Sequence, residues 1–241
     1  MHDLMSIEER INQLTEFFHD QFKEIRRLNL PEPNNGQIDI YQKTLLIAVI
    51  DCLASIRFDK SNYPYLFNQN RIRFTRFVKE YGNWPCGNRV STPFLVSRLE
   101  GKGLNGPLHD KVRAHLDKFD PTAGFSVSIE KMDFLPEELR PLSTLESEEK
   151  IIEDVQHLSL LYRYRNHLVH EYRTPGYGME VFAKGLNTAC YHGYLNDKHF
   201  YLVYPTVLFE NIVMAAIDGI EKYLIDNRVD PYNRVGDTSR W

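Results

Sequence analysis

Apolar residues recur every three to four positions near the start of the chain, which is the spacing of an amphipathic helix. This pattern predicts a helix over residues 6–28, with Ser6 as its N-cap and Glu9 as the capping-box partner. A second helix is predicted over residues 39–58. It is apolar on nearly all sides, so we expect it in the centre of a helical bundle.

Asp51 interrupts the apolar run of this second predicted helix. A carboxylate is costly to bury unless it is paired. We therefore weigh two interpretations, a carboxylate at the edge of the core and a partner for a buried arginine. Cys52 follows directly within the same apolar run, and we expect it to be a core residue.

The middle of the chain, residues 59–147, has a mixed pattern and is predicted to be an elaboration on the helical core. It contains a short alternating segment at 125–129, which is typical of a strand. Residues 91–104, STPFLVSRLEGKGL, resemble the recognition helix of winged-helix DNA-binding proteins. However, the pattern of residues 107–119 predicts another helix where the wing hairpin of such proteins would follow.

The last third of the chain carries three clear patterns. One long helix is predicted over residues 148–173, a β-hairpin over 189–204 and a closing helix over 205–227. The tail, 229–241, has no periodicity and is expected to pack loosely. Together the patterns predict a mainly α fold with a small β-hairpin insertion. It is a single helical domain over 1–228 with core helices at 6–28, 39–58, 148–173 and 205–227.

Composition narrows the possible functions. The chain has 29 basic and 33 acidic residues, a formal charge of −4, so any binding to a polyanion needs a local basic patch. Its 3 cysteines form no CxxC pair and carry no zinc spacing, and nothing demands a metal or another cofactor. No stretch has the length of a signal peptide or of a membrane span, so we expect a cytoplasmic protein without membrane contact.

Candidate chemistry is concentrated in RNHLVHEY, residues 165–172. Each residue of a helix advances about 100°, so Asn166 and His170 share a face, whereas Arg165 and His170 flank an apolar stripe. The side chains of Arg165 and His170 can meet only if the long arginine side chain reaches around, if the helix bends, or if a two-fold dimer supplies a second copy of the helix. An Arg-x4-His pair is expected by chance, but the added Asn166 and Tyr172 make the pattern fairly specific.

The pattern Arg165-Asn166-x3-His170-x-Tyr172 resembles the signature of the HEPN superfamily, especially the Arg-x4-His-x-Tyr form of HepT-type toxins. The resemblance covers the motif helix and, more loosely, the helices around it. It implies a HEPN-like bundle that forms a homodimer and brings two motifs into one cleft. It also implies a metal-independent ribonuclease, a toxin or defence effector, with Arg165 and His170 as the catalytic pair and Asn166 beside them. Tyr172 matches the position that a cognate antitoxin nucleotidyltransferase modifies in HepT-type systems.

The chemistry of these side chains suits RNA cleavage. RNA carries its own nucleophile, the 2′-OH, while histidine exchanges protons near neutral pH and arginine holds a phosphate with a fork of donors. The expected products have a 2′,3′-cyclic phosphate and a 5′-hydroxyl end. Two other functions remain open: a non-catalytic HEPN-like module that binds RNA, a nucleotide or a protein, and a DNA-binding regulator that uses residues 91–104.

A purely structural interpretation of the motif also remains open. In it, Arg165 pairs with Asp51 or Asp154 inside the fold. His170 is then a satisfied histidine at a helix C-terminus, where positive charge suits the helix dipole. Tyr172 is a packing residue. Such a pair would be sealed from solvent, whereas a catalytic pair lines an open cleft.

Overall fold

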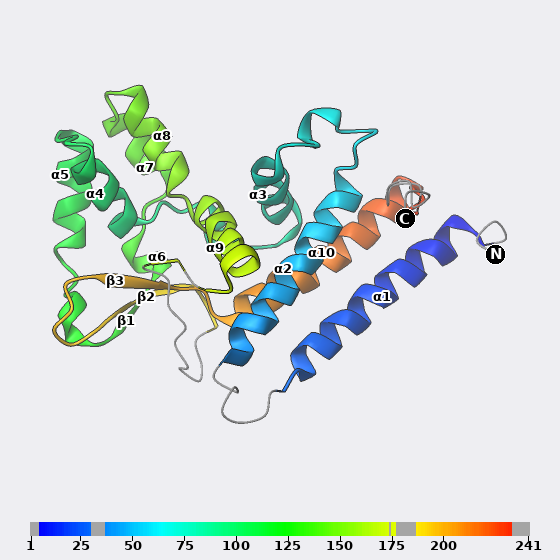
Figure 1. Ribbon diagram of the computed structural model, residues 1–241. Coiled ribbons are helices and arrows are strands. Elements are labelled where there is room, and N and C mark those ends of the chain that lie inside the picture. Colours follow the sequence, from blue (N-terminus) through cyan, green and yellow to red (C-terminus); the bar gives the residue numbers. More distant parts are fainter. Residues whose placement is uncertain (1–4, 30–36, 174, 177–186, 233–241) are drawn as a thin grey trace. The chain divides into compact units, whose positions relative to one another are not determined.

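A computed structural model describes residues 5–29, 37–173, 175–176 and 187–232 of the chain (Figure 1). The described part is mainly helical, as the sequence predicts, and contains one three-stranded antiparallel sheet. The residues assigned above to one helical domain fall into two compact units. The first unit is 1–84 with 209–241, and the second is 85–208.

The first unit is built from long helices. They are α1 (Ile7–Arg27), α2 (Ile38–Arg57), α3 (Asn70–Tyr81) and α10 (Thr206–Asp226), with a 3₁₀ turn, η3, at Pro64–Leu66. The predicted capping box begins α1: Glu9 N–H donates to Ser6 Oγ at 3.2 Å, and Ser6 N–H donates to Glu9 Oε2 at 2.7 Å. The apolar face of α1 is buried at Ile11, Leu14, Phe18, Phe22 and Ile25.

The first residues of the predicted tail pack on α1, which corrects part of the expectation that the tail packs loosely. Asp230 Oδ2 accepts a hydrogen bond from Arg10 at 2.7 Å, and the Tyr232 hydroxyl lies 3.2 Å from Gln13 Oε1. These polar contacts join residues 230–232 to the first turns of helix α1. Residues 233–241 lie outside the described part.

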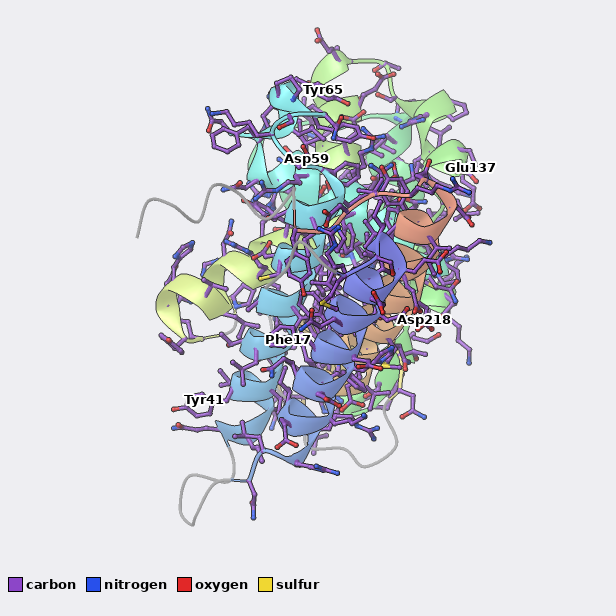
Figure 2. The ribbon with its side chains drawn as sticks, turned by 90° about the vertical axis from the view of Figure 1, so that its right-hand side faces the viewer. Phe17, Tyr41, Asp59, Tyr65, Glu137 and Asp218 are labelled. Carbon is purple, nitrogen blue, oxygen red and sulfur yellow. The ribbon has the colours of Figure 1, made fainter. Side chains whose placement is uncertain are left out.

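Helix α2 contacts α1 and α3, but one of its faces is exposed. That face carries Tyr41, Leu45, Ala48 and Cys52 at helical spacing, and Leu45 is 44% exposed. The prediction that Cys52 is a core residue is therefore wrong, because an apolar helix buries only the faces that its neighbours cover. Asp51 is half-buried on this helix. Figure 2 shows Tyr41 on α2 and Phe17 on α1, both projecting outward.

The second unit begins with η4 (Pro85–Asn88) and combines short helices with the sheet. Its helices are α4 (Thr92–Gly101), α5 (Pro107–Leu116), α6 (Ile129–Met132), α7 (Pro136–Leu139), α8 (Glu146–Asp154) and α9 (His157–Glu171), with 3₁₀ turns η5 (Pro121–Ala123) and η6 (Arg140–Leu142). Its hydrophobic core includes Val90, Leu95, Val96, Leu99, Leu108, Val112, Phe134, Leu139, Ile151, Ile152 and Val155.

The sheet confirms both β predictions. Strands β1 (Ser126–Ser128), β2 (Cys190–Gly193) and β3 (Phe200–Val203) lie in the order β1-β2-β3. Tyr191 at the centre of β2 faces Val127 on one side and Leu202 on the other. The predicted strand at 125–129 thus becomes the partner of the predicted hairpin at 189–204.

The predicted single helix over residues 148–173 is wrong, because it is two helices. Helix α8 ends at Asp154 and α9 begins at His157, with Gln156 extended (φ −63°, ψ 146°) between them. The Val155 carbonyl accepts a hydrogen bond from Ser91 N–H at 3.0 Å, and His157 N–H donates to the Arg89 carbonyl at 3.0 Å. Pairing with this distant segment breaks the helix, while the apolar spacing continues across the break.

Among the described residues, no helix has both the length and the apolar character that a membrane crossing requires.

Candidate functional site

The start of helix α9, which carries the motif, is held by a sealed polar network. His157 Nε2 lies 2.6 Å from Asp133 Oδ2, and His157 Nδ1 lies 2.8 Å from the Tyr204 hydroxyl. The Tyr191 hydroxyl lies 2.9 Å from Asp133 Oδ2 and 2.6 Å from Ser91 Oγ. All of these side chains are buried, and Asp133 also accepts a hydrogen bond from the backbone of the Ser91–Thr92 turn.

This network contains Ser, His and Asp, the residue types of a nucleophilic triad. However, Ser91 and His157 are 0% exposed, so no substrate reaches them. Burial and the nearby Asp133 carboxylate raise the pKa values of Tyr191 and Tyr204 well above the usual range for tyrosine, so both remain protonated. The network is therefore a structural clamp on α9.

The other end of α9 presents the motif to solvent. The helix ends at Glu171, and Tyr172 caps it in the left-handed region (φ 50°, ψ 36°), with its N–H donating to the Leu168 carbonyl at 3.2 Å. His170 is exposed, and the Tyr172 side chain is 64% exposed. The same helix thus carries a sealed histidine at its first residue and an open one in its last turn.

Arg165 is half-buried and lies beside its neighbours on the helix. Its Nη1 donates to Asn166 Oδ1 at 3.0 Å, and its guanidinium lies 5.8 Å from the centre of the Tyr162 ring. Because α9 is regular through this stretch, Arg165 and His170 leave the helix axis about 140° apart. Asn166 and His170 share a face, as predicted.

Asp51 and Asp154, the two carboxylates predicted as possible partners of Arg165, lie on different helices. Asp51 belongs to the first unit, on α2, whereas Arg165 belongs to the second. Asp154, at the end of α8, lies 3.8 Å from Arg163. Arg163, two residues before the predicted arginine, thus lies beside this acid.

A second set of basic side chains lies on the side of α9 that faces away from Arg165, and it was not predicted from the sequence. Arg163 and His167 are one helical turn apart and line a pocket of about 190 Å³ together with Arg98 of α4. Phe94, Tyr164, Tyr204 and Leu202 supply its apolar walls. His167 Nδ1 lies 3.1 Å from Glu171 Oε1, without hydrogen-bond geometry. His167 and Arg173 together lower the pKa of the Glu171 carboxyl. The i, i+4 spacing of Arg163 and His167 was the available signal.

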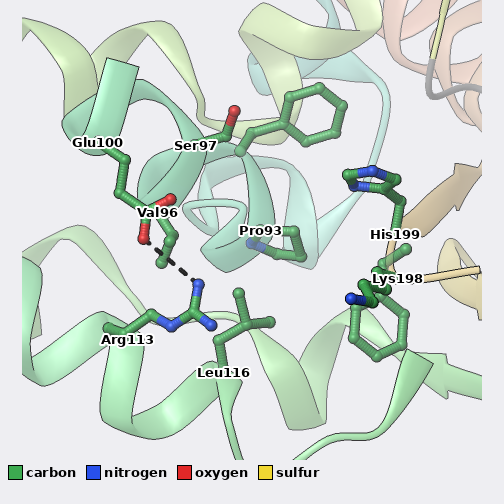
Figure 3. Close-up of a pocket in the computed structure, with 10 residues that line it drawn as sticks. Pro93, Val96, Ser97, Glu100, Arg113, Leu116, Lys198 and His199 are labelled. Atoms are coloured by element: carbon green, nitrogen blue, oxygen red, sulfur yellow. Dashed lines mark hydrogen bonds and ion pairs between the residues drawn. The ribbon is translucent and has the colours of Figure 1, made fainter. Parts of the chain in front are cut away.

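A neighbouring pocket of about 250 Å³ lies between α4, α5 and the start of β3 (Figure 3). Figure 3 shows Lys198 and His199 on one side of the pocket and Glu100 and Arg113 on the other. Arg113 forms an ion pair with Glu100 at 3.3 Å. Phe94 lines this pocket as well as the first one. Both pockets belong entirely to the second unit.

The DNA-binding hypothesis required residues 91–104 to form an exposed helix beside a basic surface. Instead, α4 buries Leu95, Val96 and Leu99 in the core of the second unit. Helix α5 follows at the place where a winged-helix protein has its wing hairpin. The hypothesis has therefore lost its structural basis.

Within the described residues, no group of three or more His, Cys, Asp or Glu side chains is placed to hold a metal ion. No family model, curated protein or solved structure matches this chain.

Proposed function

We propose that this chain is a HEPN-type endoribonuclease that cleaves RNA in the cytoplasm without a metal ion, as a toxin or defence effector. The observation that carries the proposal is the contrast between the two ends of α9. His157 is sealed and fully engaged, whereas His170 is exposed beside an accessible Tyr172. A motif retained only for packing would resemble the His157 end.

The reaction uses the nucleophile of the substrate. His170 removes the proton from a 2′-OH, the 2′-oxygen attacks the adjacent phosphorus, and the bond from phosphorus to the 5′-oxygen breaks. The leaving 5′-oxygen takes up a proton from water, and the protonated His170 returns its proton to the hydroxide that forms. The products are a 2′,3′-cyclic phosphate and a 5′-hydroxyl. Arg165 holds the non-bridging phosphate oxygens as charge develops on them, and Asn166 Oδ1 orients the guanidinium.

A homodimer completes the site in this proposal. Arg165 and His170 diverge on one helix, so a second copy of α9 supplies the group that one copy lacks. The exposed residues Tyr41, Leu45, Ala48 and Cys52 on α2 form an apolar stripe through which two copies of the chain can associate.

The test is cleavage of a 5′-labelled RNA by the purified full chain in the presence of EDTA. We expect cleavage by the wild type and a loss of at least a hundredfold in Arg165→Ala and His170→Ala, because general acid–base groups contribute about 10²–10⁴-fold. Matched controls are the exposed Arg140→Ala and the partly exposed His19→Ala, which should cleave at the wild-type rate.

Two further readouts make the assay specific. A 2′-deoxy substitution at the cleaved nucleotide should abolish cleavage, and the products should carry cyclic phosphate ends. If the two motif variants cleave as fast as the two controls, the site is wrongly assigned. If binding persists in all proteins without any product, the chain is the non-catalytic RNA-binding module.

The exposure of Tyr172 supports it as a site for modification by a cognate antitoxin. The hydroxyl of an accessible tyrosine can accept a nucleotidyl group from such an enzyme. Mass spectrometry of the Tyr172 peptide from cells that express the chain with its genomic neighbours should show the added nucleotide. An unmodified peptide under conditions that suppress the ribonuclease would contradict this role.

A further inference from the structure

The two neighbouring pockets of the second unit form one surface along α4 and β3. They share Phe94, and β3 contributes Phe200 to one and Leu202 to the other. Residues two apart on a strand point to the same face and lie roughly 7 Å apart. The pockets are therefore adjacent, and we refer to them together as the α4–β3 surface.

The α4–β3 surface carries four cations against three nearby carboxylates, a formal charge of +1 on a chain whose total is −4. Arg98, Arg113, Arg163 and Lys198 line the two pockets, against the carboxylate of Glu100. Asp117 and Asp154 pair with two of these arginines from outside the pocket linings. Binding of a polyanion by a chain of formal charge −4 requires local cations, and Arg98 and Lys198, which form no ion pair among the described residues, supply them here.

The walls between these cations are apolar and partly aromatic. Phe94 is half-buried at the junction of the pockets, and Pro93, Val96 and Leu116 line the larger one. Proteins that bind single-stranded nucleic acid combine cations that follow the backbone with rings on which bases stack. The bases of an A-form duplex are stacked on one another, so they cannot enter pockets of this kind.

We infer that the α4–β3 surface binds single-stranded RNA, with bases in the two pockets against Phe94 and phosphates on Arg98, Arg113, Arg163 and Lys198. This inference rests on the proposed function, because it identifies the substrate of that function as single-stranded RNA. Arg163 and His167 connect the surface to the motif, since they lie on the same helix α9 as Arg165 and His170. A strand bound along α4 and β3 is thus held next to the helix that cleaves it.

The experiment measures binding separately from cleavage. The probe is a fluorescent single-stranded RNA with 2′-O-methyl groups, which lacks the 2′-OH nucleophile, and its affinity for the full chain is measured by anisotropy between 50 and 200 mM salt. The test variant is Arg98→Gln with Lys198→Gln. Its matched control is Lys131→Gln with Lys150→Gln, which removes the same charge from exposed positions of the same unit.

We expect the test variant to bind about tenfold more weakly than the wild type and the control to bind within twofold. Each phosphate contact contributes about 0.7 to the slope of log affinity against log salt, so the slope of the test variant should fall by about 1.4. Phe94→Leu keeps an apolar side chain in the core and should weaken binding at least fivefold, because about 1–3 kcal/mol of stacking is lost per base.

Four outcomes overturn the inference: no binding by the wild type, equal affinity of the test and control variants, equal affinity for a duplex of the same strand, or equal displacement of the probe by polyglutamate. Arg98 and Lys198 are exposed, so the double variant folds and decides the matter even if Phe94→Leu does not. Loss of binding in the test variant without any ribonuclease activity would retain this inference and reject the proposed function. Ribonuclease activity of the wild type together with unchanged binding in the test variant would retain the proposed function and reject this inference.

Discussion

The buried Asp133 network makes a strong prediction about the stability of the second unit. Asp133→Ala removes the acceptor of three buried donors: the Thr92 N–H at 2.9 Å, the Tyr191 hydroxyl at 2.9 Å and the His157 ring at 2.6 Å. An unsatisfied buried donor costs about 1–3 kcal/mol. Since the donors share one acceptor, we expect a loss of about 4 kcal/mol.

Such a loss is readily measured. It corresponds to a fall in Tm of about 10 °C, because each kcal/mol shifts the Tm of a chain of this size by about 2–4 °C. Thermal unfolding followed by circular dichroism reports the total change. Hydrogen exchange of the α9 peptide, His157–Glu171, reports whether the helix that carries the motif is released first.

The matched control is Glu137→Ala, an acidic residue that is exposed on α7 (Figure 2). Its change in stability should stay within about 0.5 kcal/mol. If Asp133→Ala also loses less than about 1 kcal/mol, or if the α9 peptide exchanges as in the wild type, the network does not clamp the helix and the reasoning fails.

Three further predictions concern pH, backbone packing and association. The pKa of Tyr191 is raised in the folded state, so stability falls as pH rises above about 10, and Tyr191→Phe should reduce that slope by about 1.4 kcal/mol per pH unit in alkaline denaturation. Gly193→Ala places a Cβ onto the Pro121 carbonyl and should lose about 1–3 kcal/mol in urea unfolding, whereas Gly101→Ala meets no neighbour. Leu45→Glu should shift a dimer to monomer in light scattering.

Each of these predictions has an outcome that contradicts it. An alkaline slope that is the same in Tyr191→Phe and in the wild type would deny the role of Tyr191 burial. Equal stability of the two glycine variants would mean that β2 moves away from η5 without cost. Phe67→Glu, exposed but off the α2 stripe, should not change the mass, and a dimer that survives Leu45→Glu uses another surface.

Local signals in the sequence predicted most elements but not their ends. The Ser6–Glu9 capping box and the hairpin at 189–204 depend on neighbouring residues, and both are present in the structure. The break at Gln156 depends on pairing with the segment around Val90, which is distant in the chain. Periodicity within one helix carries no information about such a partner, so one helix was predicted where there are two.

The candidate site likewise has a part that local sequence predicts and a part that depends on distant segments of the chain. The motif from Arg165 to Tyr172 is visible because its residues are close in sequence. The clamp joins Asp133 to His157 and Tyr191 across separations of 24 and 58 residues, and no spacing rule connects them. The α4–β3 surface likewise brings Arg98 beside residues of α9, so only the folded unit shows it.

Helix α9 carries all the features on which the proposed action on RNA depends. Its first residue, His157, is clamped, so the direction of the helix relative to β2 and β3 is fixed. One face then holds Arg163 and His167 in the α4–β3 surface, and the last turn presents His170 to solvent. In the proposed ribonuclease, binding and chemistry thus lie on one helix, and an RNA strand held by the α4–β3 surface is cut with the help of the second protomer's motif. On this argument, loss of the clamp weakens cleavage more than binding, because cleavage alone requires the last turn of α9 to be aligned.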